Sequence, residues 1–241
     1  MRVIIAKDYE ELSQKASSIL ASQLILKPES VLGLATGSTP IGTYEELIRL
    51  CNQGIISFSS ATTFNLDEYY GLDSNNPDSY SYFMRDKLFN HVDINKSKIH
   101  IPNGLAKNIQ KECESYEGKI IEQGGIDIQL LGIGRNGHIG FNEPDIKFEA
   151  TTHGVNLDTD TIYANSRFFK NIKDVPKKAI SMGIKTIMNS KTILLLACGD
   201  EKAQIVYDTI YGKITPELPA SVLQLHPHVI VIVDKQAAKY L

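Results

Sequence analysis

The fold is decided by one stretch, Asp127-Ile128-Gln129-Leu130-Leu131-Gly132-Ile133-Gly134-Arg135-Asn136-Gly137-His138-Ile139-Gly140-Phe141-Asn142-Glu143-Pro144. It begins with a short, nearly continuous apolar run, which is the pattern of a buried strand. Glycines then interrupt the run, and Asn136, His138 and Glu143 lie among them. A buried strand that ends in a glycine-rich loop of polar groups is typical of active sites in open α/β sheets.

Outward from this stretch, apolar runs of strand length alternate with segments of helical periodicity. The predicted strands are 2–6, 31–35, 62–66, 98–101, 179–182, 192–197 and 228–233, with one or two edge strands within 147–160; helices are predicted after Asp8, after Pro40, within 75–90, over 106–123, after 198–202 and over 218–225. This alternation predicts an α/β fold: a mainly parallel sheet with helices on both faces, a Rossmann-like three-layer sandwich. We expect residues 1–241 to form a single domain.

Composition narrows the class of protein. The 241 residues carry a formal net charge of -3, which disfavours a nucleic-acid-binding face. The three cysteines are far apart in sequence, which fits a reducing compartment better than a disulfide framework. No stretch approaches the roughly 20 apolar residues of a membrane span. We therefore expect a cytoplasmic protein with neither a membrane nor a nucleic acid as partner.

The loop after the second predicted strand reads Thr36-Gly37-Ser38-Thr39-Pro40 and leads directly into a helix. Free N–H groups and the positive end of a helix dipole make such a junction a natural phosphate site, and the hydroxyls add donors. The spacing of a Walker loop is absent. The alternative is an ordinary strand-to-helix turn with a capping hydroxyl.

Three further features are ambiguous from the residues alone. Asp67 and Glu68 follow a predicted strand, either with one carboxylate facing a cleft or as a solvated acidic turn. Arg167 precedes two aromatic residues, so it either packs on a ring or binds an anion. Lys202 lies in the first turn of a helix, where lysine is unfavourable. It either pairs with neighbouring carboxylates or faces an anionic ligand.

A competing motif is present in 132–137, which matches G-x-G-x-x-G with Asp158 further on. That dinucleotide fingerprint must run into an apolar helix whose N-terminus holds the pyrophosphate. Here Gly140 and Pro144 occupy the positions of the helical turns, so we reject this interpretation.

Several stretches together resemble the glucosamine-6-phosphate deaminase family, also called glucosamine-6-phosphate isomerases. They are Leu34-Ala35-Thr36-Gly37-Ser38-Thr39-Pro40, Phe64-Asn65-Leu66-Asp67-Glu68-Tyr69, the 132–144 loop, Ala164-Asn165-Ser166-Arg167-Phe168-Phe169 and Cys198-Gly199-Asp200-Glu201-Lys202-Ala203. They span nearly the whole chain in family order. The run Gly-His-Ile-Gly-Phe-Asn-Glu-Pro is highly specific.

The resemblance implies conversion of glucosamine 6-phosphate and water to fructose 6-phosphate and ammonia. It implies that Asp67 is the base for enolisation and that His138 opens the sugar ring, oriented by Glu143. Asn136 has a lesser part in ring opening, because some relatives carry a titratable Asp there. The resemblance assigns phosphate binding to Thr36, Gly37, Ser38, Thr39, Arg167 and Lys202. It implies no cofactor and no metal.

The basic residues that follow the Asn-Glu-Pro run in the allosteric, hexameric branch are not matched here. We therefore expect a non-allosteric enzyme that is a monomer or a weak homo-oligomer, with a sugar phosphate as its small-molecule partner. Two alternatives remain: a lactone hydrolase resembling 6-phosphogluconolactonase, and a non-catalytic domain that senses a sugar phosphate.

Overall fold

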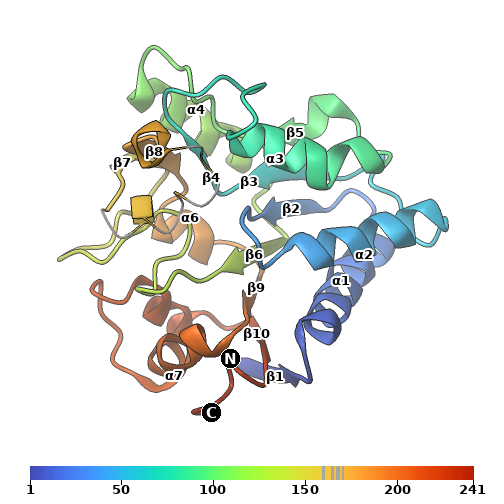
Figure 1. Cartoon of the computed structure of the whole chain (residues 1–241). Helices are drawn as coiled ribbons and strands as arrows, with labels where there is room; N and C mark the ends of the chain where they lie inside the picture. The colour runs from blue at the N-terminus through green and yellow to red at the C-terminus, as the bar shows by residue number, and fades with distance from the viewer. Residues whose placement is uncertain (159–160, 164–165, 167–168, 170) are drawn as a thin grey trace.

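The computed structural model describes residues 1–158, 161–163, 166, 169 and 171–241. Its centre is a seven-stranded sheet in which every pairing is parallel, in the order β1-β10-β9-β6-β2-β3-β5 (Figure 1). The strands are β1 (Arg2–Ala6), β2 (Val31–Leu34), β3 (Thr62–Asn65), β5 (Ile99–His100), β6 (Ile128–Gly132), β9 (Thr192–Ala197) and β10 (Val229–Asp234). The predicted α/β class with a mainly parallel sheet is confirmed.

The helices cover both faces of this sheet. They are α1 (Tyr9–Leu26), α2 (Ile41–Asn52), α3 (Tyr80–Lys87), α4 (Ile109–Glu122), α6 (Ile184–Met188) and α7 (Ala203–Tyr211), with 3-10 turns at Phe89–His91, Lys96–Lys98, Ile172–Asp174, Asp200–Lys202 and Pro219–Leu225. Figure 1 shows α1 and α2 on one side of the sheet and α6 and α7 on the other. Right-handed crossovers explain this, because the chain moves along the sheet in one direction from β1 to β3 and in the other from β5 to β10.

The strands β2 and β6 are neighbours in the sheet, and the chain leaves them in opposite directions, from β2 towards β3 and from β6 towards β9. The connection after β2 leads to one face and the connection after β6 to the other. A crevice therefore opens at the carboxyl ends of these two strands. The two loops singled out in the sequence, 36–40 and 132–144, flank this crevice.

A second, three-stranded sheet holds the segment with the paired carboxylates. β4 (Asp67–Tyr69) pairs antiparallel with β8 (Lys178–Ser181), and β8 pairs antiparallel with β7 (His153–Asn156). Residues 67–68 thus begin a strand of their own and do not form a turn after β3. The edge strand expected within 147–160 is confirmed as β7. Helix α6 was not predicted, because its five residues are too few to show a period.

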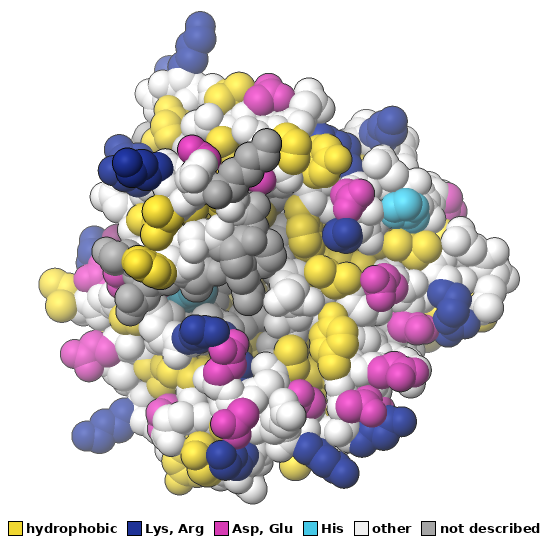
Figure 2. All heavy atoms as spheres, in the orientation of Figure 1, with side chains coloured by type: hydrophobic (Ala, Val, Ile, Leu, Met, Phe, Trp, Pro, Cys, Tyr) yellow, Lys and Arg dark blue, Asp and Glu magenta, His cyan; other side chains and the backbone are white. Residues whose placement is uncertain are grey.

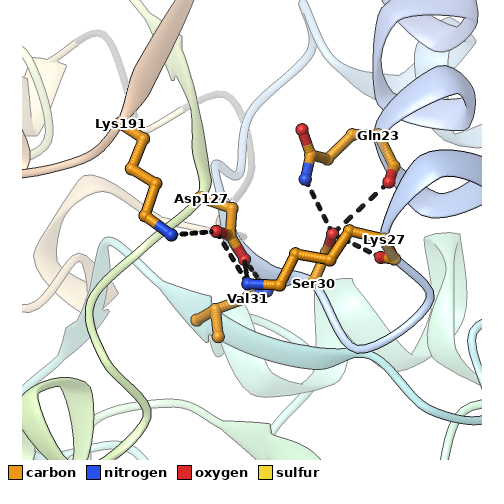
Figure 3. Close-up of polar contacts among 6 residues, drawn as sticks. All are labelled: Gln23, Lys27, Ser30, Val31, Asp127 and Lys191. Atoms are coloured by element: carbon orange, nitrogen blue, oxygen red, sulfur yellow. Dashed lines mark hydrogen bonds and ion pairs between the residues drawn. The ribbon is translucent and has the colours of Figure 1, made fainter.

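Asp127 joins the carboxyl end of α1 to the amino ends of neighbouring strands, and Figure 3 shows Lys27 and Lys191 directed at its carboxylate. Its side chain is 4% exposed and accepts hydrogen bonds from Lys27 Nζ at 2.9 and 2.8 Å and from Lys191 Nζ at 2.8 Å. The N–H of Val31 donates to it as well, at 2.8 Å. One carboxylate therefore joins α1, β2, β6 and the turn that precedes β9.

The face of the molecule seen in Figure 2 has mixed charge. Figure 2 shows basic and acidic side chains interspersed on the face in view, without a large basic patch. Among the described residues, no helix combines the length and the hydrophobicity needed to cross a membrane.

Candidate active site

Polar side chains of the loop after β6 form one hydrogen-bonded cluster around Glu143. His138 Nδ1 lies 3.1 Å from Glu143 Oε2, and Asn136 Nδ2 donates to the same oxygen at 2.8 Å. The hydroxyl of Thr161 donates to the other oxygen, Oε1. The N–H of His138 also donates to Asn136 Oδ1 at 3.2 Å. Three side-chain groups therefore fix the orientation of one carboxylate.

This cluster favours the ionised form of Glu143. Burial acts to raise the pKa of Glu143, but the hydrogen bonds and charge of His138, with the bonds from Thr161 and Asn136, hold it below its ordinary value. An ionised carboxylate accepts a hydrogen bond from the Nδ1–H of a neutral imidazole. The opposite nitrogen, Nε2, then carries the lone pair and is available to accept a proton from a ligand.

Glycines give the loop its shape. A Cβ atom on Gly134 would lie 2.4–2.5 Å from three atoms of the His138 ring, so the ring packs directly on this part of the backbone. Gly137 and Gly140 have φ values of 84° and 58°, which side-chain-bearing residues rarely adopt. The predicted loop of glycines and polar groups is thus confirmed as a compact turn built around an imidazole.

Asp67 lies next to this loop although it comes from a different sheet. Its Oδ2 atom is 3.6 Å from the position that a Cβ on Gly140 would occupy, and Ser181 Oγ is 2.9 Å from the same position. Ser181 in turn accepts the N–H of Phe141 at 3.0 Å. Pairing of β4 with β8 brings these groups together, because Asp67 is opposite Ser181 in the register.

Asp67 is only 6% exposed, and burial raises its pKa to about 8, with a smaller contribution from the charge of Glu68. A carboxylate with such a pKa can take up a proton and release it again near neutral pH. This is the property expected of a base that moves a proton between two carbons.

The loop 36–40 lies at the adjacent strand end and is held by a residue that sequence reasoning missed. The Tyr9 hydroxyl donates to the carbonyls of Ser38 and Thr39, at 3.1 Å each, and accepts the N–H of Gly42 at 2.8 Å. Gly37 has a φ of 99°. The N-cap residue of α2 is Pro40, whose side chain has no acceptor for the free N–H groups of the first turn.

Lys202 lies near the same loop. Burial raises the pKa of the Cys198 thiol, while a hydrogen bond with the side chain of Thr39 and the charge of Lys202 oppose that rise. Thr39, Cys198 and Lys202 are therefore neighbours across the ends of β2 and β9. Arg167, the other predicted phosphate ligand, lies outside the described residues.

Tyr80 links the two halves of the site. A hydrogen bond joins its side chain to that of Thr36, and the charge of Asp67 contributes, after burial and Tyr69, to raising its pKa well above the ordinary value. The structure thus brings together Thr36, Thr39 and Lys202 on one side and Asp67, Asn136, His138 and Glu143 on the other. Among the described residues, no group of three or more His, Cys, Asp or Glu side chains could hold a metal ion.

Comparisons with known proteins agree with this geometry. A family model described as glucosamine-6-phosphate isomerases/6-phosphogluconolactonase matches residues 6–231. Glucosamine-6-phosphate deaminases from Clostridium botulinum strain Hall and Clostridioides difficile strain 630 are 60% and 58% identical to this chain. Both alignments cover 100% of this chain, with 99% and 97% of the two relatives.

Solved structures extend the comparison. The structure of a monomeric glucosamine-6-phosphate deaminase is 51% identical, covers both chains in full and superposes with a TM-score of 0.98. A 6-phosphogluconolactonase from Trypanosoma brucei is 17% identical over 100% of this chain and 98% of its own, with a TM-score of 0.79, which shows a shared fold alone. Since the family model and these relatives span almost the entire sequence, the chain belongs to the family of glucosamine-6-phosphate isomerases and 6-phosphogluconolactonases.

Proposed function

We propose that this protein, with residues 1–241 acting as one domain, converts glucosamine 6-phosphate and water to fructose 6-phosphate and ammonia. The observation that carries the proposal is the buried carboxylate of Asp67 beside the His138–Glu143 pair. A lactone hydrolase would not need a base aimed at C2 of a sugar. The curated relatives that share 58–60% of this sequence are deaminases, which supports the same conclusion.

The reaction begins with ring opening. His138 Nε2 accepts the proton of the anomeric hydroxyl, and the proton passes to the ring oxygen as the C1–O5 bond breaks. Glu143 stabilises the imidazolium that forms in between, because its carboxylate already accepts a hydrogen bond from Nδ1–H. Asn136 cannot titrate, so it contributes by holding Glu143 through its amide N–H.

Isomerisation and loss of nitrogen follow. Asp67 removes the proton from C2 of the open aldose while the aldehyde oxygen takes a proton from the substrate's own ammonium group, which gives an enolamine. Asp67 then returns its proton to C1, which leaves an iminium at C2 and a hydroxyl at C1. Water adds to that carbon, and the carbinolamine releases ammonia to give the ketone. We assign the phosphate to residues 36–39, Lys202 and Arg167, where charge-assisted contacts worth about 1.5–3 kcal/mol each would hold the reacting carbons beside Asp67.

We also propose a monomeric enzyme of the cytoplasm. The relative solved at 51% identity is described as monomeric, and Cys51, Cys113 and Cys198 are free thiols, as expected in a reducing compartment.

The function is tested by incubating the protein with glucosamine 6-phosphate and measuring both ammonia and fructose 6-phosphate. We expect the two products in equal amounts. Glucosamine without phosphate is the matched control, and we expect it to react far more slowly because the 36–39 loop then has no anion to bind. Hydrolysis of 6-phosphogluconolactone without any ammonia from the amino sugar would favour the lactonase alternative.

A further inference from the structure

The second carboxylate of the pair, Glu68, has no part in the mechanism above and yet is almost completely buried. Its exposed fraction is 2%. Alternation along β4 directs it away from the side that Asp67 and Tyr69 share. On that other side it meets the first turn of α3, where its contacts are unusually complete.

Three backbone N–H groups donate to the Glu68 carboxylate. Oε1 accepts from Tyr69 at 2.8 Å and from Tyr80 at 2.9 Å, and Oε2 accepts from Ser81 at 2.8 Å. Tyr80 and Ser81 are the first two residues of α3, so the carboxylate fills the anion-binding end of that helix. One side chain therefore clamps the start of α3 onto β4.

The clamp determines where the Tyr80 ring lies. This ring is stacked on Phe141 with centroids 5.9 Å apart and lies 4.6 Å from the Tyr69 ring, and its hydroxyl donates to the Tyr69 hydroxyl at 3.3 Å. Phe141 belongs to the loop of His138. Loss of the clamp would release the residue that connects β4, the His138 loop and Thr36.

The clamp also keeps a negative charge beside the base. Burial raises the pKa of Glu68 above its ordinary value, and hydrogen bonds from three N–H groups limit that rise by favouring the ionised form. Among the described residues, no hydrogen bond to the carboxylate of Asp67 is formed, so Asp67 is the partner that takes up a proton first.

The ionisable groups around this pair come from several elements. Glu68 is the neighbour of Asp67 in β4 and acts on it through its charge, although the two side chains lie on opposite sides of the strand. The Tyr80 phenol of α3 and the Tyr116 phenol of α4 also interact with the charge of Asp67. Arg85 of α3 faces Glu68. The two phenols stay neutral near neutral pH, because burial raises the pKa of each well above its ordinary value. Glu68 is thus the charged neighbour of Asp67 among these groups.

We propose that Glu68 is a positioning residue for the proposed deaminase reaction: it clamps α3 so that Tyr80 stays against the site, and its charge keeps Asp67 ready to hold a proton. The proposal rests on the function proposed above only for its kinetic consequences. The clamp and the coupling between the two carboxylates are properties of the folded protein.

The test follows the Asp67 carboxyl directly, by 13C NMR titration of protein labelled at aspartate side-chain carboxyls. The Asp67 resonance is assigned by its disappearance in Asp67→Asn. In Glu68→Gln we expect its titration midpoint to fall by roughly one pH unit, because a neighbouring negative charge is removed. The acid limb of kcat/KM should move to lower pH by the same amount. An unchanged midpoint would overturn the proposed electrostatic role.

The variant Glu68→Asp separates the effect of the charge from the effect of the clamp. It also provides a second test of the proposal if Glu68→Gln does not fold. It keeps the charge but is too short to reach α3, so we expect a midpoint close to that of the parent and a kcat lowered about tenfold or more with a similar KM. A parental kcat in this variant would overturn the clamp.

The matched control is Glu117→Gln. Glu117 Oε1 accepts hydrogen bonds from the N–H of Thr152 at 2.7 Å and from the hydroxyls of Thr152 and Thr186 at 2.6 Å each, away from the site. We expect this variant to lower stability without moving the midpoint. If the parent protein released no ammonia from glucosamine 6-phosphate, the proposed function would fail, and the NMR titration would still decide the coupling.

Discussion

At the scale of single residues, two carboxylates beside one glycine-rich loop have pKa values displaced in opposite directions. Burial, with the charge of Glu68, raises the pKa of Asp67 to about 8, whereas hydrogen bonds from its neighbours hold the pKa of Glu143 below its ordinary value. Opposite displacements of this kind divide roles between carboxylates. Asp67 is suited to carry a proton, and Glu143 is suited to remain charged beside an imidazole.

We predict that Asp67→Asn lowers kcat by about 10²–10⁴-fold, the usual contribution of a positioned base, while substrate binding changes little. In the parent protein, kcat/KM should fall as the pH decreases below about 8, because Asp67 becomes protonated. Steady-state kinetics over pH 5–9 and a binding titration with the substrate measure both effects. Loss of binding with kcat preserved would contradict the assignment of Asp67 as base.

The same substitution should stabilise the fold. Because the pKa of Asp67 is higher in the folded state than in the unfolded state, its effect on stability becomes unfavourable as the pH rises from about 4 towards 8. Asn resembles the protonated carboxyl, so the melting temperature of Asp67→Asn should exceed that of the parent near pH 8 and match it near pH 4.

The sequence could indicate Asp67, His138 and Glu143, because they stand in specific motifs at predicted strand ends. It could not indicate Thr161 or Tyr9. Thr161 is 18 residues beyond Glu143 in the chain, and Tyr9 is 29 residues before Ser38. No periodicity links a hydroxyl to an acceptor at such separations. Only folding of the intervening elements brings them together.

At the scale of elements, the loop after β6 is the part in which geometry and chemistry are most closely joined. Its glycines let the His138 ring pack on the backbone of Gly134 and let Ser181 Oγ approach Gly140 closely. Gly134 is therefore required because a side chain there would overlap the His138 ring, and Gly137 and Gly140 are required because the turn needs positive φ values.

We predict that Gly134→Ala lowers kcat/KM by about 100-fold, because the new Cβ would overlap the imidazole and displace it from Glu143. The matched control is Gly132→Ala at the end of β6, where no described atom lies within 4 Å of the added Cβ and φ is not positive. Circular dichroism should show both variants folded. Equal activities for the two variants would mean that the ring tolerates displacement.

The elements themselves were largely predictable, since hydrophobic runs identify buried strands and Asp8 caps α1 as expected, accepting the N–H of Glu11. The assignment of strands to sheets was not. Residues 67–69 look like the end of the predicted strand 62–66, and 179–182 look like a further strand of the parallel sheet, but Asp67–Tyr69 and Lys178–Ser181 pair with each other in antiparallel fashion. Periodicity reports burial and does not report the pairing partner.

At the scale of the whole molecule, the two edges of the parallel sheet have different tasks. Near the carboxyl edge lie buried groups whose ionisation is unfavourable, such as Asp67. The amino edge carries Asp127, whose carboxylate is satisfied by Lys27, Lys191 and the N–H of Val31. The contacts of Asp127 stabilise the fold away from the site. A substitution at one edge of the sheet therefore does not touch the residues at the other edge.

Asp127→Asn should therefore destabilise the protein without changing its chemistry. Although burial acts to raise the pKa of Asp127, its two lysine partners and the N–H of Val31 lower it, so its stabilising effect is present above the unfolded pKa of about 3.9 and is lost as the pH falls below that value. At pH 7 we expect a loss of about 2 kcal/mol, or about 4–8 °C in Tm, shrinking towards pH 3. The matched control is Asp86→Asn, which breaks an ion pair with Lys87 whose side chains are 51% and 42% exposed and should change Tm little. Thermal unfolding at several pH values measures both variants, and an equal Tm for Asp127→Asn and the parent at pH 7 would show that this carboxylate does not hold the amino edge together.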